Sequence, residues 1–201
     1  MTNIRDQKLK EIRDEVWNLT QSPLYNYRKK NNYYPVLGEG NHQAKIVFIG
    51  EAPGRNEAQT GRPFCGQAGK ILDQLLQAVN IKRQDVYITN IVKDRPPGNR
   101  DPQPEEIKLY TPFLLHQLEI IQPETIATLG RFAMNFVMKE FGLEDKLKTI
   151  SQLHGQVFPT QASWGEIKII PLYHPAVAVY NVNKIDVLKK DFEILKKGSR
   201  K

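Results

Sequence analysis

The sequence predicts an α/β protein, a single domain of three α/β/α layers with a four-stranded parallel sheet. Four short apolar segments alternate along the chain with longer segments whose apolar residues stand at helical spacing. Such alternation is typical of parallel sheets with right-handed crossovers and helices on both faces. The length of 201 residues, 40% of them apolar, suits one well-buried domain and is short for two.

Residues 1–35 are expected to pack on this domain as an N-terminal helix and loop. Residues 4–20 carry apolar side chains at helical spacing among charges, and Pro23 ends that pattern. Residues 25–34 then interleave four tyrosines with three basic residues. Such a segment can stack on bases and hold phosphates, but tyrosines packed on the domain are the favoured interpretation.

The expected strands and helices place polar residues at one edge of the sheet. The strands span residues 45–50, 85–92, 125–130 and 167–173. The helices that follow them span residues 70–79, 105–121, 131–141 and 182–197. Glu51, Asn90, Gly130 and His174 each stand at or just past the carboxyl end of an expected strand. Because open α/β sheets bind ligands at this edge, we expect the four to converge on one rim.

A long loop with several glycines, from Gly50 to Gly69, joins the first strand to its helix. Such connections usually run about 2–6 residues, so a loop of this length predicts a functional site. Its glycines allow the backbone to approach a ligand closely, and Gly69 opens a helix whose free N–H groups can face an anion. The loop matches neither a Walker loop nor a dinucleotide-binding fingerprint.

Four motifs in the chain form a recognisable set. They are GEAPG at 50–54 with Glu57, GRPF at 61–64 with Gly66 and Gly69, residues 89–100, and His174-Pro175-Ala176. Their order and spacing resemble those of the family 4 uracil-DNA glycosylases, from about Val36 to the C-terminal helix. The resemblance implies the uracil-DNA glycosylase-like fold. It also implies a monofunctional glycosylase that releases uracil from DNA and leaves an abasic site.

Base removal breaks the C1′–N bond through a sugar cation while the base leaves as an anion. The resemblance makes Phe64 the aromatic side chain that stacks on the flipped base and Asn90 the amide that reads it. His174 is expected to donate a hydrogen bond to the uracil O2, an interaction worth about 10²–10³ in rate. Gly50 and Ala52 complete the expected substrate-binding group. Taken alone, Phe64 would be read as a core residue and Asn90 as a turn cap.

Two carboxylates are candidates for holding the water or stabilising the sugar cation. In the wider superfamily an aspartate often orients the water, but that position is Ala52 here, as in family 4. Glu51 and Glu57 remain, and Glu51 is slightly favoured because it stands nearer to the strand end. Ala58 replaces an aspartate that family members usually carry.

The expected DNA contacts are basic side chains and backbone amides. Lys93, Arg95 and Arg100 are predicted to contact phosphate, together with amides of the glycine loops at Gly66 and Gly69. Tyr180, at a position often held by arginine in the family, is a candidate wedge that replaces the flipped base. The formal charge of +7 favours an anionic partner, although a basic surface without that role is an open alternative.

The chain departs from the family at its metal site. Family 4 enzymes usually carry a four-iron, four-sulfur cluster on four cysteines. The motifs place those ligands at Leu19, Ser22, Asp94 and Tyr110. The one cysteine is Cys65, so no cluster, metal or cofactor is expected. Apolar packing by Leu19 and Tyr110 is expected to replace the cluster, with Asp94 in exposed ion pairs with Lys93 and Arg95.

Uracil-containing DNA, single- or double-stranded, is the expected partner. The sequence has no apolar run of 18 residues and no signal-peptide pattern, so we expect no membrane association and a cytoplasmic location. A monomer is the default expectation. Two alternatives stay open: a glycosylase for another deaminated or damaged base, and a non-catalytic protein that binds DNA lesions.

Overall fold

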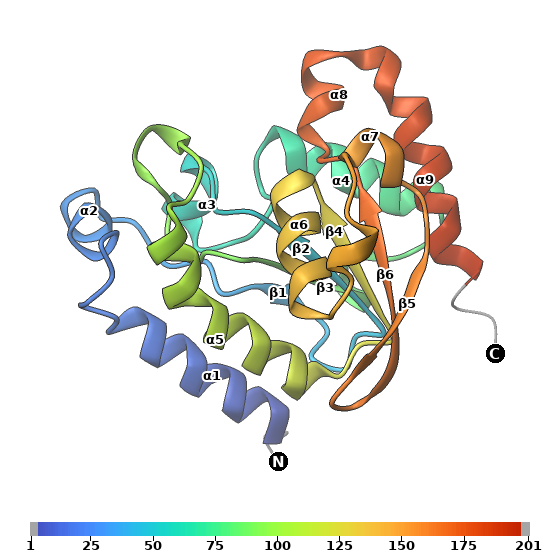
Figure 1. Ribbon diagram of the computed structural model, residues 1–201. Coiled ribbons are helices and arrows are strands. Elements are labelled where there is room, and N and C mark those ends of the chain that lie inside the picture. The colour runs from blue at the N-terminus through green and yellow to red at the C-terminus, as the bar shows by residue number, and fades with distance from the viewer. Residues whose placement is uncertain (1–3, 198–201) are drawn as a thin grey trace.

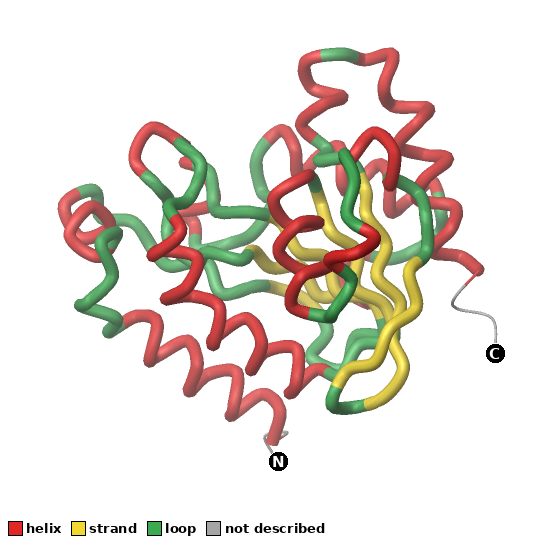
Figure 2. The backbone as a smooth tube through the Cα atoms, viewed as in Figure 1, coloured by secondary structure: helices red, strands yellow, loops and turns green. Residues whose placement is uncertain are grey.

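In the computed structural model, which describes residues 4–197, a six-stranded sheet lies between two layers of helices (Figures 1 and 2). The strand order is β1-β3-β2-β4-β6-β5. The strands are β1 (Glu39–Gly40), β2 (Ile46–Gly50), β3 (Tyr87–Asn90), β4 (Thr125–Leu129), β5 (Phe158–Ala162) and β6 (Gly165–Leu172). The four inner strands β3, β2, β4 and β6 are mutually parallel, which confirms the predicted parallel sheet.

Two antiparallel edge strands were not predicted. β1 has only two residues and pairs with β3, while β5 forms a hairpin with β6. The β5 sequence, FPTQA, contains a proline and two polar residues, so it lacks the apolar run of a buried strand. Proline and alternating exposure are tolerated there because an edge strand pairs on one side only. The sheet therefore has six strands rather than four.

The long helices agree with the predicted ones to within a few residues. The helices are α1 (Ile4–Trp17), α2 (Tyr25–Lys30), α3 (Arg55–Thr60), α4 (Gln67–Ala78), α5 (Pro104–Ile121), α6 (Arg131–Glu140), α7 (Ile150–Leu153), α8 (Ala176–Tyr180) and α9 (Ile185–Lys197). The short helices α2, α3 and α8 occupy segments that were expected to be loops, and α7 lies in a segment for which no element was predicted. Within residues 4–197, no helix has both the length and the apolar character needed to cross a membrane.

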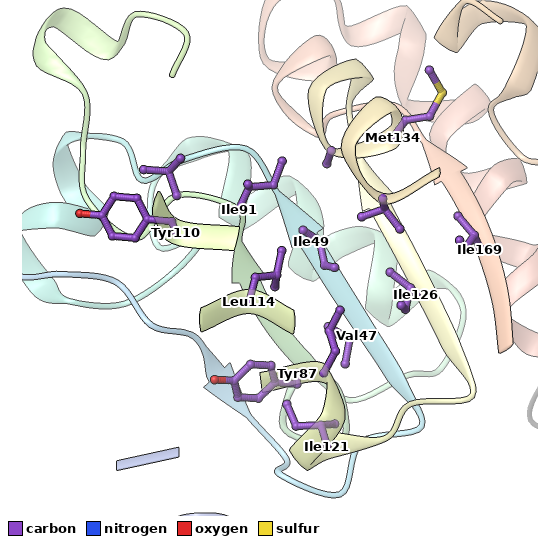
Figure 3. Packing of buried hydrophobic residues seen from close by; sticks show 14 of the residues in the cluster. Val47, Ile49, Tyr87, Ile91, Tyr110, Leu114, Ile121, Ile126, Met134 and Ile169 are labelled. Atoms are coloured by element: carbon purple, nitrogen blue, oxygen red, sulfur yellow. The ribbon is translucent and has the colours of Figure 1, made fainter. Parts of the chain in front are cut away.

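Each face of the sheet carries its own hydrophobic core. On one face, Val47 and Ile49 of β2 pack with side chains of α5 and α6 such as Leu114 and Met134 (Figure 3). α1 packs on the outside of α5, so the N-terminal helix adds to this layer (Figure 1). On the other face, α4 and α9 cover the sheet. Successive side chains of β2 point to opposite faces of the sheet. Because both faces are covered, the β2 sequence is apolar throughout.

A buried polar network ties the chain after α1 to α5 and to the loop after β3. The Tyr110 hydroxyl donates to Asp94 Oδ2 at 2.6 Å and lies 2.9 Å from Ser22 Oγ. Arg28 Nη1 donates to both Asp94 oxygens, at 3.0 and 3.1 Å, and to the Val16 carbonyl at the end of α1. Ser22, Arg28, Asp94 and Tyr110 are all buried. Arg28, from the segment after α1, and Tyr110 of α5 therefore meet at the carboxylate of Asp94, in the loop after β3.

This network corrects one expectation about the positions that hold a cluster in the family. Asp94 is buried against Arg28 and Tyr110, so the predicted exposed ion pairs with Lys93 and Arg95 are wrong. The predicted packing is confirmed, since Leu19 and Tyr110 are buried in one core. A hydrocarbon, two hydroxyls and a carboxylate already bound to arginine do not fit an iron–sulfur cluster, which takes thiolate ligands.

Candidate active site

A cleft of about 420 Å³ opens at the carboxyl edge of the parallel strands, a size typical of small-ligand sites. Its walls come from the loops that follow β2, β3 and β6. The lining residues are Glu51, Ala52, Pro53, Gly54, Glu57, Phe64, Ala68, Asn90, Pro96, Asn99, Arg100, Asp101, His174 and Ala176. The structure thus brings Asn90 and His174, which are distant in the sequence, together with Phe64 and both candidate carboxylates from the loop after β2.

The base of the cleft forms around Gly50. Gly50 pairs with Asn90 in the register of β2 and β3, so the two residues stand side by side. A Cβ atom at Gly50 would lie 2.9 Å from the Phe64 ring and would also overlap the Asn90 side-chain oxygen. Phe64 has a left-handed backbone, with φ of 47°, which is unusual for a bulky residue. Glycine at position 50 therefore lets the ring and the amide converge at one place.

The Asn90 side chain carries an unused acceptor. Asn90 is 2% exposed, and its Oδ1 atom has no hydrogen-bond partner among the described residues. An unsatisfied buried acceptor costs about 1–3 kcal/mol. Because Asn90 lines the cleft, a ligand N–H donor would remove this cost.

His174 is a neutral hydrogen-bond donor at pH 7. The Ala176 N–H donates to its Nδ1 at 3.2 Å, which places the imidazole proton on Nε2. Burial lowers the pKa of His174 to about 4, and nearby Glu57 opposes the shift only partly. Its ring lies 5.5 Å from that of Phe64, centroid to centroid. Gly130, at the end of β4, leaves room for the imidazole because a Cβ there would lie 3.2 Å from His174 Cβ.

Glu51 has a carboxyl group that titrates near neutrality. Burial raises its pKa to about 7, and the negative charge of Asp101 adds to the rise while Arg131 opposes it. Asp101 and Arg131 form an ion pair of 3.5 Å beside the cleft. Neither was anticipated from the sequence, where both stand outside the four motifs. A carboxyl with a pKa near the working pH is suited to general base catalysis.

Glu57 holds the loop that carries Phe64. Its Oε1 accepts hydrogen bonds from the backbone N–H groups of Cys65 and Gly66, at 3.0 and 2.9 Å. These two amides immediately follow Phe64 and precede α4. Glu57 lines the cleft, but this oxygen is committed to the loop. The next residue, Ala58, is fully buried in a helix, where an apolar side chain fits and an unpaired aspartate would not.

The predicted phosphate contact of Lys93 is wrong. Lys93 is fully buried, and its ammonium donates to Thr89 Oγ1 at 2.8 Å, the Asn90 carbonyl at 2.7 Å and Gln117 Oε1 at 2.6 Å. Burial lowers the pKa of this ammonium well below its ordinary value. Lys93 therefore supports the end of β3, next to Asn90, and does not reach the surface.

The predicted DNA contacts through glycine amides are also corrected. The Gly66 N–H already donates to Glu57, and Gly69 is buried in the first turn of α4. A Cβ at Gly69 would overlap the Phe64 carbonyl. Both glycines therefore shape the loop around Phe64. The sequence could not separate this role from DNA contact, because both need glycine.

The remaining predicted DNA contacts stand at the surface around the cleft. Arg100 lines the cleft and is held by Glu106 through hydrogen bonds of 2.6 and 2.9 Å. Arg95 lies in the same loop and is half-buried. Tyr180, at the end of α8, is 89% exposed. Their contacts with DNA stay predictions.

Comparison with known proteins gives the family. Residues 37–196 match the model of the uracil DNA glycosylase superfamily. A type-4 uracil-DNA glycosylase of Archaeoglobus fulgidus is 43% identical over 188 residues, which cover 93% of this chain and 91% of the relative. A type-4 enzyme of Thermotoga maritima is 40% identical over 178 residues, 88% of this chain and 86% of the relative. A type-5 enzyme of Pyrobaculum aerophilum is 28% identical over 184 residues, 84% of this chain and 77% of the relative. The chain belongs to the uracil-DNA glycosylase superfamily.

Proposed function

We propose that this protein hydrolyses the N-glycosidic bond of uracil in DNA, releasing uracil and leaving an abasic site. The observation that carries the proposal is the buried, unpartnered Oδ1 of Asn90 in the cleft. The N3–H of uracil is the donor that this acceptor lacks, and the same amide can donate from Nδ2 to O4. In the amide orientation that pairs with uracil, cytosine would place its unprotonated N3 opposite Oδ1 and offer no donor there. Phe64 supplies a ring on which the extruded base can stack.

The departing base is stabilised by His174. As the C1′–N1 bond breaks, its electron pair passes to the base, and negative charge spreads to O2 and O4. The Nε2–H of the neutral imidazole donates a hydrogen bond to O2, where this charge develops. Because the pKa of His174 is about 4, the imidazole acts at neutral pH as a hydrogen-bond donor, without carrying a charge of its own.

We assign the water and the sugar cation to Glu51. In its ionised form this carboxylate stabilises the positive charge on the sugar. It also accepts a proton from the water as the water oxygen bonds to C1′. Glu57 is the less suitable candidate because its Oε1 atom is bound by two amides of the Phe64 loop. Glu57 is therefore a positioning residue, and Gly50 and Ala52 line or underlie the space for the base.

The proposal includes the surface around the cleft. Arg95, Arg100 and Tyr180 are the remaining candidate DNA contacts, and the formal charge of +7 favours a polyanion. A single domain that acts as a cytoplasmic monomer, on single- or double-stranded DNA, stays a prediction from the sequence.

The direct test is alkaline cleavage of a labelled oligonucleotide that carries one uracil, after incubation with catalytic amounts of protein at low salt. We expect strand scission with the wild type, and a fall of roughly a hundredfold for His174→Ala and for Asn90→Ala. His116→Ala is the matched control, because His116 is exposed on α5 and does not line the cleft. DNA binding without any base release by the wild type would overturn the proposal and favour a lesion-binding protein.

A further inference from the structure

Arg95 is held in place by three neutral groups beside the cleft. Its Nη1 atom donates to the hydroxyls of Tyr27 and Tyr33, at 3.1 and 3.0 Å, and its Nε atom donates to Asn99 Oδ1 at 2.7 Å. The guanidinium carbon lies 5.5 Å from the centre of the Tyr33 ring. These contacts join α2 and the residues that follow it to the loop after β3. The guanidinium therefore has a defined orientation before any ligand arrives.

The charge of this guanidinium is not neutralised. Neighbouring arginines pair with carboxylates: Arg28 with Asp94, and Arg100 with Glu106. Arg95 has no such pair in the part of the chain that the structure describes. An oriented cation without an internal counter-charge favours an anion from outside.

The same cluster has unused donors. The phenol oxygens of Tyr27 and Tyr33 accept from Arg95, and neither hydroxyl donates to a residue between 4 and 197. Over the same residues, Nη2 of Arg95 donates to no acceptor. Phenol O–H groups and a guanidinium edge are donors that suit phosphate oxygens.

The position of the cluster connects it to the base site. Asn99, which accepts from Arg95 Nε, also lines the cleft, as does Pro96. Lys29 and Lys30, both exposed, follow Tyr27 on α2 and add positive charge to the helix that carries Tyr27. The backbone next to Arg95 is fixed as well, because Asp94 is anchored in the buried network.

We propose that Arg95, Tyr27 and Tyr33 form a binding site for one phosphodiester of the DNA strand that carries the target nucleotide. The inference rests on the proposed function, because it assumes that the target base occupies the cleft. The site adds affinity and orients the strand, and it takes no part in bond cleavage. If the three residues only joined α2 to the loop, their loss would lower stability without changing how the protein responds to any particular phosphate.

The test is a scan with neutral phosphates. A short labelled single strand carries 2′-fluoro-deoxyuridine, whose electron-withdrawing fluorine suppresses the sugar cation, and one methylphosphonate linkage that is moved along the strand. Dissociation constants are measured for the wild type and for Arg95→Gln. We expect one linkage at which the wild type loses about tenfold or more in affinity, while Arg95→Gln loses less than about twofold there. The slope of log affinity against log salt should also fall by about 0.7 for Arg95→Gln.

Two variants serve as comparisons. Arg13→Gln removes the same charge from α1, where Arg13 pairs with Asp14, and should keep the wild-type pattern along the strand. The double variant Tyr27→Phe with Tyr33→Phe keeps the rings and Arg95, so it tests the hydroxyls even if Arg95→Gln folds poorly. In this double variant, the loss of affinity caused by the methylphosphonate at the same linkage should be smaller than in the wild type.

The phosphate site would be overturned if neutralising each linkage cost the wild type and both cluster variants the same affinity. It would also be overturned if the wild type did not bind DNA. Uracil release, measured separately by alkaline cleavage of an ordinary uracil strand, distinguishes the two proposals. If one linkage affects the wild type but not Arg95→Gln and no uracil is released, the phosphate site is kept and the catalytic function is overturned. If uracil is released but no linkage distinguishes the wild type from Arg95→Gln, the catalytic function is kept and the phosphate site is overturned.

Discussion

At the level of single residues, burial shifts the pKa values of two cleft residues in opposite directions. It lowers the pKa of His174 to about 4 and raises that of Glu51 to about 7, because the charged form is disfavoured in both. At pH 7 the imidazole is therefore neutral, and the Glu51 carboxyl is close to its pKa. The resemblance named these residues, but only the surroundings in the folded protein determine their protonation.

We expect kcat/KM to rise with pH through about 7, since Glu51 must be ionised to act. Below that pH the rate should fall by about tenfold per unit. His174 cannot cause this fall, because its pKa of about 4 lies well below it. Steady-state rates at several pH values for wild type and Glu51→Gln check this: the variant should be slow and without the transition near 7. A variant that keeps the same transition would remove Glu51 from the assignment.

The raised pKa of Glu51 also makes the free energy of unfolding depend on pH. The native pKa of Glu51, about 7, exceeds its ordinary value of 4.5, so the native state binds the proton more tightly than the unfolded chain. Its contribution to the free energy of unfolding is present below pH 4.5 and is lost as pH rises through 7. Urea unfolding of wild type and Glu51→Gln at pH 5 and pH 8 measures the difference. We expect the stability of Glu51→Gln relative to wild type to be higher at pH 8 than at pH 5, and no such change would contradict the raised pKa.

Gly50→Ala tests the base of the cleft. The added methyl group would meet the Phe64 ring and the Asn90 amide, so one of them must move. We expect uracil release to fall by at least tenfold, roughly the loss that follows misplacement of one binding group. The alkaline cleavage assay measures the rate, and circular dichroism confirms that the variant is folded. Wild-type activity in a folded variant would show that the space above Gly50 is not used.

At the level of elements, the predicted strands and long helices are confirmed because apolar periodicity records burial directly. β2, β3 and β4 are buried over their whole lengths and β6 over its second half, and α4 and α5 carry apolar residues at helical spacing. The edge strands β1 and β5 and the short helices were missed for the opposite reason. Each is too short or too exposed to have a pattern of its own, and neighbouring elements define it.

The buried network should stabilise the contact between the N-terminal segment and the loop after β3. Tyr110→Phe keeps the ring but removes the donor to Asp94 and the partner of Ser22, so we expect a loss of about 1–3 kcal/mol. Asp94→Asn should cost more, about 3–5 kcal/mol, because it leaves the Arg28 charge buried without its counter-ion. Equilibrium urea unfolding measures both. Losses within 0.5 kcal/mol, roughly the range of a surface substitution, would exclude this role.

At the level of the whole molecule, two cores on opposite faces of one sheet predict a single cooperative unit. Trp17 lies at the end of α1, and Trp164 lies in the hairpin between β5 and β6, where its Nε1 donates to the Pro123 carbonyl at 3.0 Å. Trp17→Phe and Trp164→Phe each leave one tryptophan as a probe. We expect fluorescence and far-ultraviolet circular dichroism to give the same denaturation midpoint within each variant. A separate transition for Trp17 would mean that the N-terminal segment unfolds on its own.

The sequence by itself determined the parallel core and the convergence of four motifs on one rim. Strand periodicity shows which segments are buried, and the parallel arrangement brings their carboxyl ends together. Tertiary structure alone decided that Lys93 is buried, that Glu57 binds the loop of Phe64, that Asp94 pairs with Arg28, and that His174 carries its proton on Nε2. The physical reason is that hydrogen bonding and desolvation depend on distances between residues far apart in the chain. Composition and spacing do not contain those distances.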